Sequence, residues 1–199
     1  MKRYSIGIVD YGVGNLSAVR QIIKKTGHRG RVSKEKKELA SSDMLILPGV
    51  GTFAAAMDSL NQSGLCDFLK NWAVDNRPIL GICLGMQLFA DFSMEFQKTR
   101  GLGLIAGKVM PLKSPRWHIG WNRIAMAGGQ DIFNQKDSDF YYFNHSYTYQ
   151  SEGKYQIAKT SLSEGGKPIE AAIKKGNLIG VQFHPEKSQA AGRRVMTQV

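Results

Sequence analysis

One cysteine of this sequence stands in a setting that favours chemistry. Residues 78–87 read P-I-L-G-I-C-L-G-M-Q, so Cys83 follows an apolar run in the form G-x-C-x-G. This form is typical of a nucleophile elbow, where a buried strand turns sharply into a helix and where Gly81 and Gly85 would supply clearance. The N-terminus of the helix would favour a thiolate, so we predict that Cys83 is a nucleophile. Cys66 lacks framing glycines, and we expect a buried structural cysteine there, which is also the alternative for Cys83.

A reactive thiol needs a base, and one histidine is better placed than the others. The sequence contains His28, His118, His145 and His184. His184 follows the apolar run 178–183 and precedes Pro185 and Glu186. A residue before proline is extended, so alternation should place the His184 and Glu186 side chains on one side of the chain, with the carboxylate holding the imidazole. We expect Cys83 and His184 to meet at the carboxyl ends of neighbouring strands, where parallel sheets bind ligands.

A third segment of interest is Pro48-Gly49-Val50-Gly51, which directly follows an apolar run. Its glycines permit a turn whose N–H groups could face a developing oxyanion. We therefore predict that the N–H groups of Val50, Gly51 and Leu84 form an oxyanion site. An ordinary surface turn is the alternative.

The elements that must position these residues change in character along the chain. Apolar spacing predicts strands at residues 4–9, 44–47 and 79–82, and helices at 16–25, at 53–60 and at a segment ending at 71–76. Beyond Gly101 shorter β segments are expected at residues 108–112, 119–124, 140–143, 155–160, 169–173 and 178–183, followed by a helix at 188–196. We predict an α/β fold: an open, mostly parallel central sheet with helices on both faces, plus an antiparallel strand-rich part.

Length and composition point to one unit. The 199 residues are 42% hydrophobic, and no linker or repeat divides them, so we expect a single domain over residues 1–199. No apolar run approaches the roughly 20 residues of a membrane helix, and the start is too short for a secretory core, so a cytoplasmic location without a membrane partner is expected. Two cysteines with no zinc-like spacing predict neither a disulfide framework nor a metal site.

The charge is strongly basic, with 27 Lys and Arg against 16 Asp and Glu and a net charge of +11. Residues 1–40 hold ten basic and three acidic side chains, a net of +7. The basic side chains are scattered over a helical pattern without interleaved aromatics. This favours a solvated surface over a nucleic-acid site, and we expect no nucleic-acid partner.

In combination, these motifs resemble the class I (triad) glutamine amidotransferases. Within that family the sequence is most similar to the glutaminase subunits of imidazole glycerol phosphate synthases, which serve histidine biosynthesis. The likeness spans nearly the whole chain and rests on residues 10–16 (D-Y-G-V-G-N-L), 48–51, 81–87, 101–105 (G-L-G-L-I), 118–122 (H-I-G-W-N), 145–147 (H-S-Y) and 182–188 (Q-F-H-P-E-K-S).

The resemblance implies a Cys83, His184 and Glu186 triad that hydrolyses L-glutamine through a glutamyl thioester, without a cofactor. It also implies that the glutamine site is lined by Gly49, Gln87, Glu95, His145, Ser146 and Tyr147, with Glu95 suited to the substrate ammonium. Finally, it implies a heterodimer in which ammonia passes to a (βα)8-barrel synthase subunit. Asn15, His118, Trp121 and Asn122 are the interface candidates.

Three alternatives remain at the level of sequence. Trp117 and Asn144 depart from the family pattern and would suit a paralogous glutaminase that serves a related barrel synthase in modified-sugar biosynthesis. Residues 12–14 (G-V-G) suggest a nucleotide-binding module, but Ser17 replaces the third glycine of that fingerprint. A cysteine hydrolase of the α/β-hydrolase type would place its acid before its histidine, whereas Glu186 follows His184.

Overall fold

The chain is built around one large sheet whose strands come from both ends of the sequence. The structure is a computed structural model that describes residues 3–128, 131–163 and 167–198. The sheet has the order β2-β1-β3-β4-β14-β13-β12-β9. Its parallel part consists of β1 (Ser5–Val9), β2 (Arg29–Ser33), β3 (Met44–Leu47), β4 (Ile79–Ile82) and β14 (Leu178–Val181). Its antiparallel part consists of β13 (Pro168–Lys175), β12 (Gln156–Ser161) and β9 (Ala125–Met126).

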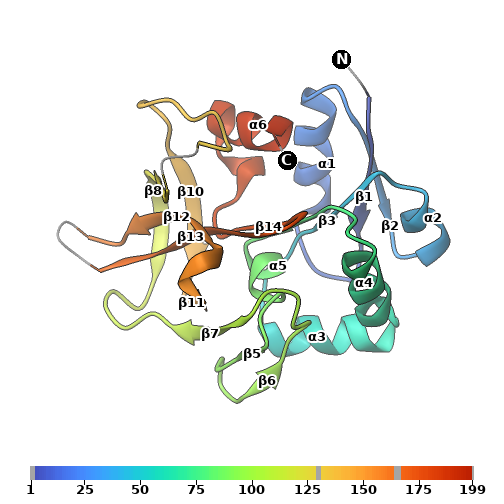
Figure 1. Cartoon of the computed structure of the whole chain (residues 1–199), viewed down its shortest axis with the longest axis horizontal. Helices are drawn as coiled ribbons and strands as arrows, with labels where there is room; N and C mark the ends of the chain where they lie inside the picture. Colours follow the sequence, from blue (N-terminus) through green and yellow to red (C-terminus); the bar gives the residue numbers. More distant parts are fainter. Residues whose placement is uncertain (1–2, 129–130, 164–166, 199) are drawn as a thin grey trace.

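Helices cover both faces of this sheet (Figure 1). On one face lie α1 (Leu16–Lys25) and the C-terminal α6 (Gln189–Gln198), and on the other lie α3 (Phe53–Gln62), α4 (Leu65–Val74) and the short α5 (Leu84–Gln87). The small helix α2 (Lys36–Ala40) packs beside β1 and β2. Strands β3 and β4 are buried along their whole length because apolar layers cover both sides. The predicted α/β fold class is thereby confirmed.

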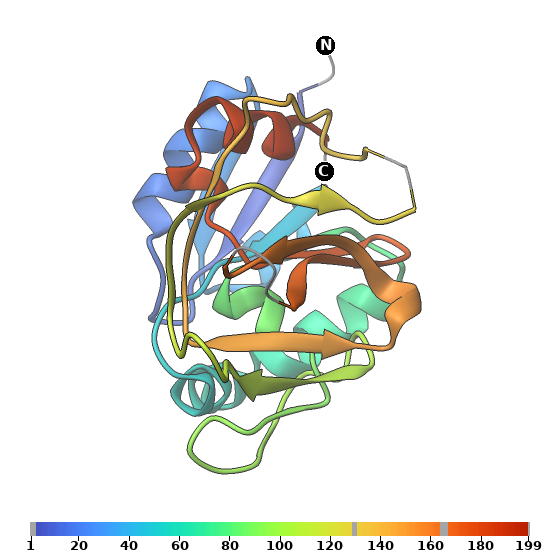
Figure 2. The same cartoon turned by 90° about the vertical axis from the view of Figure 1, so that its left-hand side faces the viewer.

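The strand-rich part forms two further, smaller sheets. One contains β11 (Tyr147–Ser151), β7 (Gly107–Pro111), β5 (Phe92–Ser93) and β6 (Thr99–Arg100), and in Figure 2 the orange β11 and green β7 lie below the main sheet. The other is an antiparallel pair of β8 (His118–Asn122) and β10 (Tyr141–His145). Two short 3₁₀ turns, η1 (Gly153–Tyr155) and η2 (Pro185–Lys187), complete the described elements.

The sequence-based boundaries are most accurate where apolar periodicity is strongest. The helix at residues 16–25 and the strands at 44–47 and 79–82 have the predicted limits. In α1 the apolar residues Val19, Ile22 and Ile23 are the buried ones, so helical spacing identified the packed face correctly. The predictions did not include β2, α2, β11 or the short strands β5, β6 and β9.

The two halves of the chain meet in the centre of the main sheet. Strand β14, near the C-terminus, lies between β4 and β13, and Val181 pairs with Ile82. The two halves of the described chain therefore share one sheet, and the single domain over residues 1–199 stays a prediction. In the described parts of the chain, no helix is both long and apolar enough to cross a membrane.

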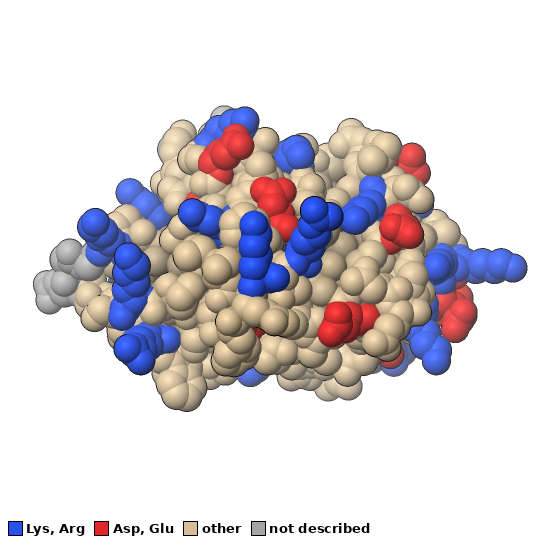
Figure 3. Space-filling model, turned by 90° about the horizontal axis from the view of Figure 1, so that it is seen from below, with Lys and Arg blue, Asp and Glu red and all other residues tan. Residues whose placement is uncertain are grey.

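Charged side chains are spread over the surface rather than gathered. On the face shown in Figure 3, Lys and Arg side chains are spread from one side to the other; Asp and Glu lie among them in the middle and on the right, but not on the left. A nucleic-acid interface would instead show a continuous basic stripe. On this face, the basic side chains are scattered residues exposed to solvent.

Candidate active site

Cys83 lies at a strained turn between β4 and α5. Its backbone has φ 54° and ψ −110°, a conformation that residues other than glycine rarely adopt. Such strain is typical of functional sites. A Cβ added to Gly81 would lie 2.7 Å from the Gly85 carbonyl oxygen, and one added to Gly85 would lie 1.8 Å from the Leu47 carbonyl oxygen. The two glycines are therefore required by the close approach of three backbone segments, as the nucleophile-elbow pattern predicts.

The helix after Cys83 is shorter than the sequence suggested. The α-helical part of α5 spans only Leu84–Gln87, a single turn. A macrodipole builds up from many aligned peptide units, so one turn contributes little to stabilising a thiolate. A side chain supplies a further donor, because the Nε2 group of Gln182 donates to the Cys83 sulfur at 3.7 Å.

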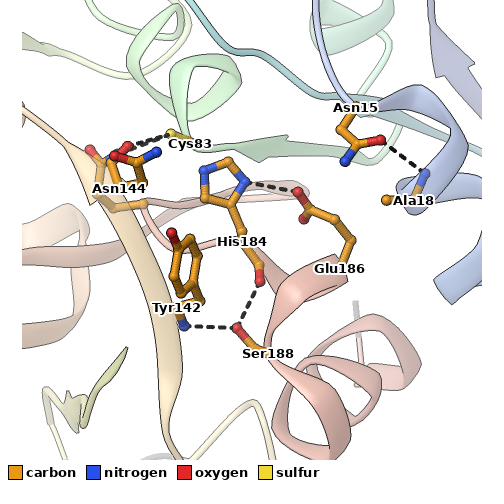
Figure 4. Close-up of polar contacts among 9 residues, drawn as sticks. Asn15, Ala18, Cys83, Tyr142, Asn144, His184, Glu186 and Ser188 are labelled. Atoms are coloured by element: carbon orange, nitrogen blue, oxygen red, sulfur yellow. Dashed lines mark hydrogen bonds and ion pairs between the residues drawn. The ribbon is translucent and has the colours of Figure 1, made fainter. Parts of the chain in front are cut away.

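His184 reaches the same place from the neighbouring strand. It follows β14, which pairs in parallel with β4, and its backbone N–H donates to the Tyr142 carbonyl at 2.8 Å. The buried Ser188 hydroxyl donates to the His184 carbonyl at 2.7 Å and accepts from the Tyr142 N–H at 3.0 Å. These bonds tie the His184 backbone to β10 and point its ring between Cys83 and Glu186 (Figure 4).

Glu186 contacts His184, but for a different reason from the predicted one. The distance from His184 Nδ1 to Glu186 Oε1 is 2.8 Å. Pro185, Glu186 and Lys187 form the 3₁₀ turn η2, so the carboxylate folds back onto the ring instead of alternating along an extended chain. Strand β14 also ends earlier than the predicted segment 178–183, at Val181.

The electrostatics of this pair favour a charged imidazole. The side chains of His184 and Glu186 are only 4% and 2% exposed. Burial alone would lower the pKa of His184, but hydrogen bonding to Cys83 and Glu186 outweighs burial and raises this pKa to about 10. The arrangement therefore suits a thiolate beside an imidazolium, which is the form that attacks a carbonyl carbon.

A cavity of about 160 Å³ opens over the sulfur. Of the predicted site residues, those that line it are Val50, Gly51, Cys83, Leu84, Gln87, Glu95, His145, Ser146, Tyr147 and His184. Gly49 lies behind this lining, where a Cβ would come within 2.6 Å of the Tyr11 hydroxyl and 2.9 Å of Leu84 Cβ. The cavity is small beside the 300–1,000 Å³ of typical cofactor and drug sites, which fits an amino acid better than a nucleotide.

Two contacts hold the walls of this cavity in place. The Tyr11 hydroxyl donates to the Pro48 carbonyl at 2.6 Å and thereby anchors the loop that carries Val50 and Gly51. On the other side, the Glu95 carboxylate accepts a hydrogen bond from the N–H of Phe53, at the start of α3. Glu95 is therefore a buried, fixed carboxylate at the rim rather than a mobile surface residue.

Sequence reasoning assigned no role to three residues that the structure brings to the sulfur or to His184. Gln182 is fully buried beside the thiol, Ser188 fixes the His184 backbone, and the Asn144 carbonyl lies 4.0 Å from the Cys83 sulfur. A glutamine inside the apolar run 178–183 was the one available signal, because a buried amide needs polar partners.

The interface candidates do not all reach the surface. Asn15 is exposed and caps α1 by accepting from the Ala18 N–H, Trp121 is 46% exposed and Asn122 is half-buried. The prediction of His118 as an interface residue is corrected by the structure. His118 is only 5% exposed, and its side chain bonds to His145 and Asn122 inside the protein. In an antiparallel pair successive residues alternate between the two faces, so His118 points inward while Ile119 points outward.

Comparison of the sequence with known families identifies the family of this chain. The sequence model of the glutamine amidotransferase class-I family matches residues 8–198. Since this match covers nearly the whole chain, the protein belongs to the class-I glutamine amidotransferase family. This result confirms the resemblance seen in the motifs.

Several similar proteins share the name imidazole glycerol phosphate synthase subunit HisH. The protein from Geobacillus thermodenitrificans (strain NG80-2) is 40% identical, over 97% of this chain and 93% of its own length. The one from Carboxydothermus hydrogenoformans (strain ATCC BAA-161 / DSM 6008 / Z-2901) is also 40% identical, over 95% of each chain. The one from Bacillus subtilis (strain 168) is 37% identical, over 97% of this chain and 94% of its own.

Solved structures share the fold at much lower identity. The structure of PurLQS from Thermotoga maritima has a TM-score of 0.77 at 16% identity and covers 99% of this chain and 97% of that one. A glutamine amidotransferase from Thermotoga maritima has a TM-score of 0.68 at 15% identity, with 94% of this chain and 77% of that one covered. At these identities the likeness supports the architecture alone.

Proposed function

We propose that this protein is the glutaminase subunit of an imidazole glycerol phosphate synthase in histidine biosynthesis. One observation carries the proposal: a strained cysteine shares a small cavity with a buried histidine, itself paired with a buried carboxylate, in a chain about 40% identical to HisH subunits. The substrate is L-glutamine and the product delivered to the partner is ammonia. We propose a cytoplasmic location, in keeping with a biosynthetic enzyme, and no cofactor.

The chemistry follows from the contacts of Cys83 and His184. The thiolate attacks the carboxamide carbon of glutamine and forms a tetrahedral oxyanion. When the C–N bond breaks, the imidazolium of His184 gives its proton to the departing nitrogen, so ammonia and a glutamyl thioester result. Water then adds to the thioester, His184 takes its proton, and the C–S bond breaks to release glutamate and restore the ion pair. Glu186 holds the imidazole through its Nδ1 group.

Two parts of the cavity suit the charges of this reaction. The N–H groups of Val50, Gly51 and Leu84 belong to residues that line it, and they would stabilise the oxyanion. The Glu95 carboxylate would bind the α-ammonium of glutamine. Gln87, His145, Ser146 and Tyr147 complete the substrate wall, with Gly49 behind it.

The exposed surface of the β8–β10 pair supports the proposal that the protein binds a partner subunit. Four large apolar side chains are exposed there, namely Trp117, Ile119, Trp121 and Phe140. A cluster of exposed aromatics on a protein of this size marks an interaction site. We propose that this surface, with Asn15 and Asn122, docks a (βα)8-barrel synthase subunit in a heterodimer.

Glutamate release in three samples tests the function: the chain alone, the chain with its synthase subunit, and both with the synthase nucleotide substrate. We expect low hydrolysis by the isolated chain and a rise on each addition, because ammonia release must be coupled to its use. Absence of glutamine hydrolysis in all three samples would refute the proposal. Full activity of the isolated chain would refute the coupling.

A further inference from the structure

Two histidines that take no part in the proposed proton transfers face each other inside the protein. His118 on β8 pairs with His145 on β10, and their side chains are 5% and 7% exposed. His118 Nδ1 and His145 Nε2 are 2.8 Å apart, and the His118 ring stacks on Phe143 with centroids 4.4 Å apart. This is a direct imidazole–imidazole hydrogen bond, so one ring must donate and the other must accept.

The neighbouring groups determine which nitrogen donates. His145 Nδ1 lies 2.8 Å from the Tyr147 carbonyl, which can only accept, so that nitrogen carries the hydrogen. Burial lowers the pKa of His145 to about 3 and that of His118 to about 4, so each ring carries one proton at neutral pH. His145 Nε2 must then accept from His118 Nδ1. His118 Nε2 in turn accepts from the Asn122 amide at 2.9 Å, and this amide also donates to the Ser161 carbonyl.

The chain of hydrogen bonds continues from Tyr147 to the thiol. The same Tyr147 carbonyl accepts from Gln87 Nε2 at 3.1 Å, which fixes the orientation of that amide. The second Nε2 hydrogen of Gln87 goes to Gln182 Oε1 at 3.0 Å. Gln182 therefore presents its Nε2–H group, and not its oxygen, to the Cys83 sulfur at 3.7 Å.

We propose that Asn122, His118 and His145 are positioning residues of the proposed glutaminase. Their hydrogen bonds hold the Tyr147 carbonyl, and this carbonyl keeps the Gln87 and Gln182 amides turned so that a donor faces the sulfur. A donor stabilises a thiolate, whereas an amide oxygen in its place would repel it. The role rests on the proposed function, but the direction of the hydrogen bonds is a property of the fold and can be measured without any activity.

The first test is NMR of the full chain with ¹⁵N-labelled histidine at pH 7. Ring nitrogen shifts should show His118 and His145 both neutral with the hydrogen on Nδ1, which is the less common tautomer of a free histidine side chain. Assignment comes from the spectra of His118→Asn and His145→Asn. An Nε2–H tautomer or an imidazolium at either residue would overturn the proposal, whether or not the protein hydrolyses glutamine.

The second test compares two substitutions of His118 in the complex with the synthase subunit. His118→Phe keeps the stacking on Phe143 but removes the donor, and we expect kcat to fall about 10–100-fold with little change in KM. His118→Asn places an amide N–H near the position of Nδ1 and should recover most of kcat. His28→Phe, at a half-buried histidine that does not line the cavity, is the matched control.

Three kinetic results would contradict the positioning role. Wild-type kcat in His118→Phe would show that the donor is dispensable, and equal losses in both His118 variants would show that only packing matters. A change confined to KM would place His118 in substrate binding. Should His118→Phe fail to fold, His118→Asn and the NMR tautomers still decide the question.

Discussion

At the residue scale, the site depends on side chains whose partners are hydrogen-bonded in turn. Cys83 and His184 are the proposed reacting groups; the Ser188 hydroxyl bonds to the His184 carbonyl, and the Gln182 amide donates to the Cys83 sulfur. Trp117 and Asn144, which depart from the family pattern, contact each other: the indole N–H of Trp117 donates to the Asn144 side chain at 3.4 Å. Asn144 lines the cavity and its carbonyl faces the thiol, so the exposed Trp117 contacts a residue of the cavity wall from the solvent side.

Ser188 gives a prediction at this scale. In Ser188→Ala the half-buried N–H of Tyr142 loses its acceptor and the His184 carbonyl loses its donor, so the free energy of unfolding should fall by about 1–3 kcal/mol. Glutamine hydrolysis should fall as well, because His184 is less firmly placed. Urea denaturation and glutamate release measure the two effects. Ser63→Ala removes comparable bonds at an exposed helix end and should change neither quantity appreciably.

At the element scale, strand order explains how residues a hundred positions apart come together. Strands β4 and β14 are parallel neighbours, so Cys83 and His184 follow their carboxyl ends on the same sheet edge. The backbone of α5 then crosses β3 at close range, and this crossing fixes the sharp turn at Cys83. This crossing is close enough that only glycine fits at residue 85.

Gly85→Ala therefore tests the elbow. The added methyl would lie 1.8 Å from the Leu47 carbonyl oxygen, and backbone atoms cannot move aside cheaply, so we expect a loss of several kcal/mol of stability or failure to fold. Gly153→Ala meets no atom within 4 Å and is the matched control. Thermal unfolding compares the variants, and a Gly85→Ala protein as stable as wild type would contradict the close approach.

The sequence predicted elements well where one face or both faces are buried. The runs at residues 44–47 and 79–82 are entirely apolar because layers cover both sides of the sheet, and their limits were correct. Strand β2 was missed because it is the sheet edge, with exposed Arg29 and Arg31 in place of an apolar run. Strand β11 does alternate Tyr147 and Tyr149 with the polar Thr148 and Gln150, but this short signal was not used.

The candidate site was predictable only in part. Glycine framing identified the elbow at Cys83, and the motif around Glu186 paired it with His184. The hydrogen bonds that join β8 to the thiol depend on contacts between β8, β10 and β14, which no local pattern encodes. The buried position of His118 likewise depends on which face of β8 turns inward.

At the scale of the whole molecule, buried histidines make stability depend on pH in the acid range. The pKa values of His118 and His145 fall to about 4 and about 3 through burial, below the value near 6.5 of an unfolded chain. As the pH falls below 6.5 the unfolded state binds protons first, so the stability that is present above 6.5 is lost toward pH 4. Urea midpoints at pH 7 and pH 5 should therefore differ less in His118→Asn than in wild type; an identical pH dependence would contradict the burial of a neutral His118.

The exposed apolar surface of the β8–β10 pair gives the other prediction at this scale. Trp121→Glu should weaken association with the synthase subunit by at least about tenfold, because a desolvated aromatic at the centre of an interface carries much of the binding energy. The fold should be unchanged, since the side chain is already half in solvent. Phe96→Glu, at an 87% exposed side chain in another part of the molecule, should bind normally. Calorimetric titration of the partner measures both.

The rate of glutamine hydrolysis by Cys83→Ala and Cys66→Ala tests the proposed nucleophile most directly. Each variant is first shown to be folded and is then assayed in complex with the synthase subunit. Cys83 is the proposed nucleophile and Cys66 is a buried cysteine of α4, so the two variants remove the same thiol group from different settings. We expect Cys83→Ala to lose at least about 10³-fold in kcat, and Cys66→Ala to keep its rate. A folded Cys83→Ala protein that hydrolyses glutamine at the wild-type rate would contradict the account.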